Sequence, residues 1–198
     1  MDQVEAVRQI AWIRETMERS SRYSSYSGVG AILSGLLALV GAGLSFGVHL
    51  KVGVLFGSAL GTWALIWLLV FTGALMTNIT FTTRKARRLG VEAWTPKTRR
   101  IIFSMLPAFV LAACWTAALV LSGRLDTIPA AWMSTYGLSL CAASAQGVPE
   151  ARPLGYLFVI TGAVGLFLPL SFGLGLLALS FGGYHLVYGG YVYAKLDG

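Results

Sequence analysis

Charged side chains are absent from every long apolar stretch of this 198-residue chain. Intramembrane carboxylates and cations are costly in lipid, and they are typical of ion-coupled transporters, proton relays and voltage sensors. Their absence argues against those three classes. Hydrolytic and phosphoryl-transfer sites also need a base, a nucleophile and a charge-stabilising group within reach of one another. The sequence therefore favours a non-enzymatic protein.

Cysteine and histidine are also scarce, with two of each. Cys114 and Cys141 both lie within apolar stretches, and the sequence contains no CxxC motif and no Cys/His cluster. This pattern argues against a disulfide framework and against a zinc site, and it predicts two packed, unreactive thiols. His49 is expected in a short solvated turn, which leaves His185 as the one histidine within an apolar stretch.

Apolar residues are abundant instead, since 56% of the chain is hydrophobic and 12% is charged, a composition typical of membrane proteins. A spanning helix needs about 20 mostly apolar residues, and six stretches approach or exceed that length. They are residues 28–48, 52–77, 101–122, 127–146, 154–170 and 172–193. Stretch 127–146 carries several hydroxyl side chains, so a tilted or re-entrant segment is its alternative. The sequence predicts an all-α polytopic transmembrane helical bundle, with residues 28–198 as one domain.

The distribution of lysine and arginine indicates the orientation of this bundle. Of 15 such residues, only Lys51 and Arg124 fall on one side of the predicted membrane. The positive-inside rule then places both termini and the loop 82–100 in the cytoplasm, next to a bacterial-type inner membrane. The cations of that loop are expected to face anionic lipid or a partner protein rather than nucleic acid. They include Arg84, Lys85, Arg87, Arg88, Arg99 and Arg100.

Residues 1–27 are predicted to form a cytoplasmic amphipathic helix followed by a Ser/Tyr linker. Val7, Ile10 and Ile13 recur near helical spacing. Charges are spread through the whole segment, which argues against a cleavable signal peptide. The helix is expected to lie on the cytoplasmic leaflet or to dock onto a protein partner through residues 1–22.

Two pairs of stretches resemble each other. Residues 28–47 and 155–173 share a spacing of glycine, leucine and hydroxyl residues, and the stretches that follow them continue the match. Spans one and two and spans five and six are therefore a candidate repeat of one hairpin. Both hairpins would enter from the cytoplasm, so the copies would be parallel, related by an axis along the membrane normal. Chance similarity between glycine-rich apolar segments is the alternative.

Glycines at helical spacing predict close contacts between helices, because small residues let backbones approach each other in lipid. A contact within one subunit is favoured over a contact in a homo-oligomer. The glycines concerned are Gly53, Gly57 and Gly61 in the second stretch and Gly175, Gly182 and Gly189 in the last.

His185 is the main candidate for a functional residue. It lies three residues after Gly182 and four before Gly189, so a regular helix would place it on the glycine stripe, facing the bundle. The imidazole would hydrogen-bond a neighbouring helix, ligate the metal of a haem or chlorin, or bind a ligand or line a pore. The residues predicted to line an amphiphilic pocket with it are Trp63, Tyr184 and Tyr188.

Three functions are compatible with these features. The first is a non-enzymatic inner-membrane protein that acts as an accessory, regulatory or scaffold subunit of a membrane complex. The second is a channel or carrier for a small neutral or lipophilic molecule. The third is a haem- or chlorin-binding membrane protein that uses His185 as an axial ligand.

Overall fold

The computed structural model describes residues 5, 7–9, 12, 27–49 and 58–197, which form helices and short connections without any strand. This confirms the all-α prediction. The first helices are α2 (Gly28–His49), α3 (Ala59–Arg88) and α4 (Pro96–Leu121), and a short turn, η1 (Leu125–Thr127), leads into α5 (Ile128–Ala145) and α6 (Ala151–Gly165). The last helix is continuous and consists of α7 (Leu170–Leu177), the π-helical turn η2 (Ala178–Tyr184), α8 (His185–Val192) and a second π-helical turn, η3 (Tyr193–Asp197).

Four of the described helices are long and apolar enough to cross a membrane, namely α2, α3, α4 and the last helix. α5 has 18 residues and α6 has 15. A helix of 15 residues is only about 22 Å long, which is less than the roughly 30 Å of a hydrocarbon core. The chain thus has the helices of a multi-pass membrane protein, with four candidate spans in its described part where the sequence predicts six.

Helices occupy most of the predicted basic loop 82–100. α3 continues to Arg88 and α4 begins at Pro96, so that only residues 89–95 connect them. Basic side chains in the last turn of α3 favour a helix C-terminus through the helix dipole, and a capping box begins α4. The predicted stretches 154–170 and 172–193 are separate helices, because α6 ends at Gly165 and α7 begins at Leu170, directly after Pro169.

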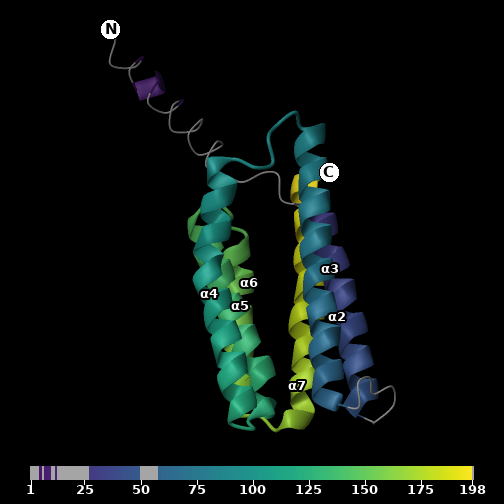
Figure 1. Ribbon diagram of the computed structural model, residues 1–198. Coiled ribbons are helices and arrows are strands. Elements are labelled where there is room, and N and C mark those ends of the chain that lie inside the picture. The colour runs from purple at the N-terminus through teal and green to yellow at the C-terminus, as the bar shows by residue number, and fades with distance from the viewer. Residues whose placement is uncertain (1–4, 6, 10–11, 13–26, 50–57, 198) are drawn as a thin grey trace.

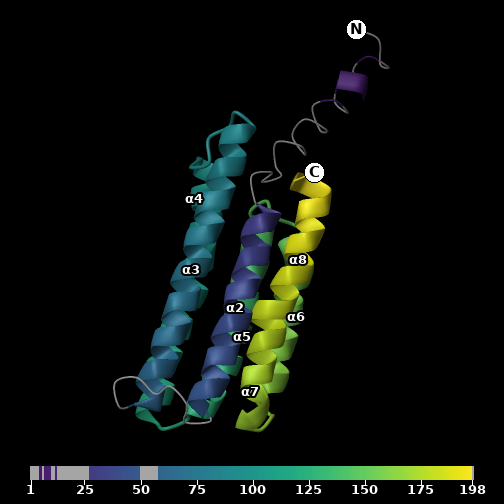
Figure 2. The same cartoon turned by 90° about the vertical axis from the view of Figure 1, so that its right-hand side faces the viewer.

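The helices form two layers of three (Figure 1). In one layer α2 lies between α3 and the last helix, and in the other α5 lies between α4 and α6. We call one end of the bundle the basic end. The helices α2, α4 and α6 begin at this end, and α3, α5 and the last helix terminate there. Since α2 begins at the basic end and α5 ends there, the two central helices run in opposite directions, as do their flanking helices (Figures 1 and 2).

Glycines bring the helices of each layer into backbone contact. A Cβ atom on Gly35 of α2 would lie 2.9 Å from the carbonyl oxygen of Gly182, and a Cβ atom on Gly189 would lie 2.7 Å from the backbone nitrogen of Ile32. The same close approach joins α5 and α6, where a Cβ atom on Gly155 would lie 2.9 Å from the carbonyl oxygen of Gly137. These positions exclude any larger residue because small residues alone let two backbones come this near.

The other predicted packing glycines do not make such contacts in the described chain. Gly175 has open space where a Cβ atom would stand, and Gly61 meets only the side chain of Ser58, which caps its own helix. Gly53 and Gly57 lie outside the described residues. Cys114 is exposed on α4 rather than packed, whereas Cys141 is partly buried against α6.

The two pairs of helices proposed as a parallel repeat do not pack alike. α2 packs on α3 along much of its length, whereas α6 packs on α5 and touches the last helix only briefly. Two other sets of contacts do correspond. The packing of α2 on α3 corresponds to that of α5 on α6, and the packing of α2 on the last helix corresponds to that of α5 on α4. These triplets run in opposite directions, so their contact pattern is the one that an inverted repeat with its axis across the helices would have.

A short sequence match fits the inverted relation. The tripeptide Thr-Gly-Ala occurs at residues 72–74 of α3 and at residues 161–163 of α6. In both copies the glycine faces the preceding helix, since Gly73 lies against Leu37 of α2 and Gly162 lies against Ser134 of α5. Of residues 1–27, only Glu5, residues 7–9, Trp12 and Ser27 are described, so the predicted amphipathic helix lies almost wholly outside the described residues.

Candidate functional site

His185 lies where the two layers meet. It begins α8, and its side chain is only 6% exposed. Its Nε2 atom lies 2.8 Å from the hydroxyl oxygen of Tyr136 on α5, so this hydrogen bond joins the two layers. The imidazole also lies 5.5 Å from the ring of Phe158 and 6.2 Å from the ring of Phe181, measured between centroids. Aromatic side chains from three helices therefore enclose it.

The π-helical turn η2 determines which way His185 faces. A π-helix closes hydrogen bonds between residues five apart, so side chains after it are rotated relative to a regular helix. Gly182 and Gly189 face α2, whereas His185 faces α5 and α6. The expectation that His185 shares the glycine stripe is therefore wrong, although it does face the interior. Such turns occur frequently at functional sites.

The hydrogen-bonding capacity of the second ring nitrogen of His185 is not fully satisfied. Nδ1 is buried and has no hydrogen-bond partner of good geometry among the described residues, although the carbonyl groups of Ser180 and Phe181 lie beside the ring. If the Tyr136 hydroxyl donates the hydrogen bond to Nε2, the neutral imidazole carries its proton on Nδ1. A buried polar atom without a partner is the kind of group that an ordered water or a ligand satisfies.

This environment suits a hydrogen-bonded histidine better than an axial ligand of a haem or chlorin. A metal at Nε2 requires the bond to Tyr136 to break and the surrounding rings to move apart. The described residues also contain no group of three or more His, Cys, Asp or Glu side chains that would hold a metal ion.

Tyr184 forms a second polar link between the layers. Its hydroxyl oxygen lies 2.8 Å from the Oγ1 atom of Thr161 on α6, and its ring meets that of Phe158 edge-on at 5.5 Å. Tyr188 packs against the buried cluster that Phe158 forms with Ala130, Met133, Leu140, Ala151, Leu154 and Leu177. The structure thus brings both predicted tyrosines to the interface where His185 lies.

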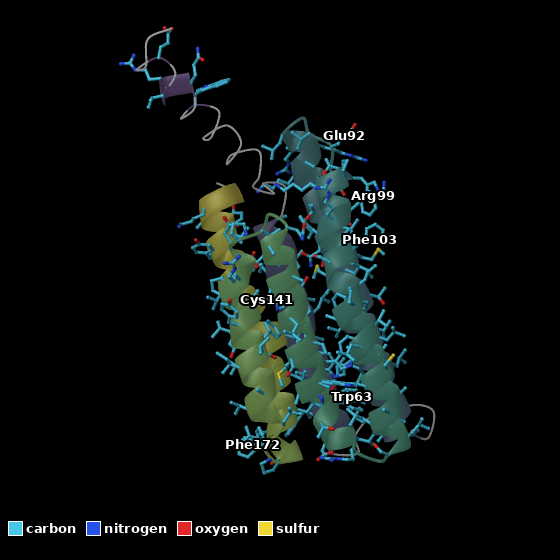
Figure 3. The ribbon with its side chains drawn as sticks, turned by 90° about the vertical axis from the view of Figure 1, so that its left-hand side faces the viewer. Trp63, Glu92, Arg99, Phe103, Cys141 and Phe172 are labelled. Carbon is cyan, nitrogen blue, oxygen red and sulfur yellow. The ribbon has the colours of Figure 1, made fainter. Side chains whose placement is uncertain are left out.

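Trp63 reaches this interface indirectly. It packs against the same buried cluster, and its ring lies 6.1 Å from that of Trp67. The Trp67 ring in turn lies 6.4 Å from Phe181. Trp67 also donates a hydrogen bond of 3.1 Å to Ser45 of α2. Figure 3 shows Trp63 far from the basic end, where Glu92 and Arg99 lie.

A second group of aromatic side chains closes the edge between α3 and α4. The ring of Phe71 on α3 lies 6.0 Å from Phe109 on α4 and 6.5 Å from Trp132 on α5. Phe109 lies 6.3 Å from Tyr136, so the ring contacts continue from this edge to His185. The helices α3 and α4 make little other contact with each other.

Asn78 is a further polar residue of the interior, which the sequence pattern did not single out, and it lies on α3. Its Nδ2 atom donates hydrogen bonds to Ser34 of α2 (2.7 Å) and to the Ala74 carbonyl (2.9 Å). Its Oδ1 atom is buried and has no partner within the described chain. The signal was an amide side chain directly after the predicted stretch 52–77, since polar side chains of this kind hydrogen-bond helices together in lipid.

The predicted basic residues gather at the basic end, away from His185. All six lie in the last turns of α3 or the first turn of α4. No protein-family model, no curated protein and no solved structure matches the chain.

Proposed function

We propose that this protein is a membrane carrier or channel for a small neutral or lipophilic molecule, which binds between the two layers beside His185 and Tyr136. The observation that carries the proposal is the opposite direction of the two layers. Inverted repeats are a recurrent design of transporters, and their substrate sites lie at the interface of the repeats near the middle of the membrane.

In this proposal all six helices cross a bacterial-type inner membrane, with the basic end and both termini in the cytoplasm. Short helices such as α6 are accommodated by local thinning of the bilayer or by flanking side chains that reach the interface. The exposed cations of α3 and α4 at the basic end support this orientation.

The packing of the bundle supports movement of one layer against the other. Within each layer, glycines hold the helices in backbone contact, which resists sliding. Between the layers, aromatic side chains meet and two neutral hydrogen bonds form, Tyr136–His185 and Thr161–Tyr184. Each such bond contributes about 0.5–1.5 kcal/mol net. Breaking both hydrogen bonds therefore costs about 1–3 kcal/mol, and each aromatic ring pair that separates between the layers adds about 0.5–1.5 kcal/mol.

The chemistry of the interface favours a neutral ligand. The polar groups beside His185 are hydroxyls and an imidazole, and the walls are aromatic. Sites of this kind bind molecules with an apolar body and a few hydrogen-bonding atoms. A charged ligand would lack a counter-ion here.

Thermal unfolding in a mild detergent tests the proposal. A panel of neutral aromatic and aliphatic compounds is screened for those that raise the midpoint temperature of the full chain. Stabilisation by a true ligand disappears in Tyr136→Phe and His185→Gln and persists in Trp132→Phe, a matched control on the same helix as Tyr136. If every stabilising compound acts equally on all four proteins, the binding site is not at His185.

The accessory, regulatory or scaffold role is the second candidate, and the exposure of α3 and α4 favours it. In the most apolar 18-residue segment of each helix, the share buried within the chain is only 6% in α3 and 11% in α4. It is 44% in α2 and 39% in the last helix. A partner subunit would cover this surface. Light scattering of the purified protein tests the idea, since a stable monomer without a co-purifying chain contradicts it.

Haem or chlorin binding is the third candidate. It predicts an absorbance band in the Soret region after expression with haem supply, and loss of that band in His185→Ala. Purified protein without the band contradicts this role.

A further inference from the structure

The tip of the α3–α4 hairpin extends beyond the rest of the bundle. α3 has 30 residues, which corresponds to about 45 Å, so about ten of its residues lie beyond a hydrocarbon core of roughly 30 Å. Figure 2 shows the tip reaching past the ends of α2 and α8. In the proposed six-span orientation, on which this inference rests, the side chains of this tip lie at the level of lipid headgroups.

The tip is strongly basic. Residues 84–100 contain seven lysines and arginines and one glutamate, Glu92, so their net charge is 7 − 1 = +6. Five exposed arginines form no ion pair within the described chain, and among their guanidinium groups only that of Arg84 has a contact there, lying 5.5 Å from the centre of the Phe81 ring. The five are Arg84, Arg87, Arg88, Arg99 and Arg100.

Apolar side chains are exposed among these cations. Leu89 is 53% exposed, Val91 49% and Trp94 66%, all within the connection between the two helices. Tryptophan is enriched where membranes meet water because its ring is apolar and its N–H group is polar. Arginines beside exposed apolar residues match a lipid surface, which offers phosphate groups and hydrocarbon together.

The connection is held in one conformation. Gly90, at φ +67°, ends α3 with the two hydrogen bonds of a Schellman motif, Gly90 N–H to Arg87 and Val91 N–H to Ala86. At the start of α4, Thr95 and Thr98 form a reciprocal capping box. Neither helix end moves freely relative to the connection, so the arginines of both helices are presented together.

We propose that this tip binds the headgroup of an anionic phospholipid, with the phosphate held by arginines of α3 and α4 and with Trp94 anchored in the interface. The position at the membrane boundary and the exposed apolar residues favour a lipid over an acidic protein. Basic residues near an anionic membrane surface each strengthen binding about fivefold.

Native mass spectrometry of the full chain in neutral detergent tests the proposal, with phosphatidylglycerol and phosphatidylcholine as probes. Phosphatidylglycerol is expected to remain bound preferentially, and Arg99→Gln with Arg100→Gln is expected to reduce that preference by about twenty-five-fold. Arg124→Gln, at the opposite end of the bundle, is the matched control and leaves the preference unchanged. The preference also falls as salt is raised, because salt screens exposed charges.

Three outcomes overturn the proposal. Equal retention of the two lipids shows that the tip does not select anionic headgroups. Displacement of phosphatidylglycerol by millimolar inorganic phosphate, with no lipid required, shows a site for free phosphate. A preference unchanged in the arginine variants, together with loss of an acidic co-purifying protein from them, shows a protein-docking surface. Unfolding midpoints of all variants in neutral detergent verify that the fold is intact.

Discussion

Replacing Tyr136 with phenylalanine removes the hydroxyl group that lies 2.8 Å from His185 Nε2 and keeps the ring that packs against Phe158 and Phe181. The substitution loses a hydrogen bond worth about 0.5–1.5 kcal/mol and leaves a buried nitrogen unsatisfied, which costs about 1–3 kcal/mol. Hydrogen bonds between membrane helices average about 0.6 kcal/mol, with a maximum of about 1.7. We therefore expect the free energy of unfolding to fall by about 1–3 kcal/mol.

A double-mutant cycle isolates the hydrogen bond from the other effects. Tyr136→Phe, His185→Phe and the double variant are compared by reversible unfolding in mixed micelles. Replacing both partners with apolar rings removes the unsatisfied atoms, so the double variant is expected to be more stable than the sum of the single losses predicts. The coupling energy is expected between about 0.6 and 1.7 kcal/mol. Coupling below about 0.3 kcal/mol, the usual scatter of independent sites, would refute the hydrogen bond.

Three further predictions follow from the packing and the topology. Gly189→Ala places a Cβ atom 2.7 Å from the Ile32 backbone nitrogen and is expected to destabilise the protein by about 1–3 kcal/mol in thermal unfolding, whereas Gly175→Ala, in open space, is expected to be neutral or slightly stabilising. Asn78→Leu is expected to cost about 0.6–1.7 kcal/mol by the same measurement; no loss would show that its bond to α2 contributes nothing. An alkaline phosphatase fusion after residue 147 is expected to be inactive, because that position is cytoplasmic if all six helices cross. An active fusion contradicts the six-span topology.

The sequence predicted the helices of this protein better than their ends. Apolar length alone indicates a helix, because a chain in lipid must satisfy its backbone internally. It marks where the membrane ends rather than where the helix ends. The last turns of α3 carry threonines and cations outside the apolar stretch, and they remain helical to Arg88. The predicted end at residue 77 therefore lies well inside the helix.

Local spacing in the sequence could not predict the hydrogen-bond partner of His185. Tyr136 lies 49 residues away in sequence, on the stretch with the most hydroxyl side chains, and no periodicity links the two. The π-helical turn before His185 also has no local signature, because it becomes visible only through hydrogen bonds. Spacing likewise indicated glycine stripes without showing which face meets a helix, so Gly175 looked equivalent to Gly182.

The absence of charge in the apolar helices affects how easily the two layers can separate. A buried ion pair between layers would resist separation, because breaking such a pair leaves an uncompensated charge and costs about 3–5 kcal/mol. The interface instead uses neutral pairs, Tyr136 with His185 and Thr161 with Tyr184. The irreplaceable contacts, those between glycine backbones, lie inside each layer. We therefore expect the helices within each layer to stay together and the two layers to move relative to each other at their interface, where the proposed ligand binds.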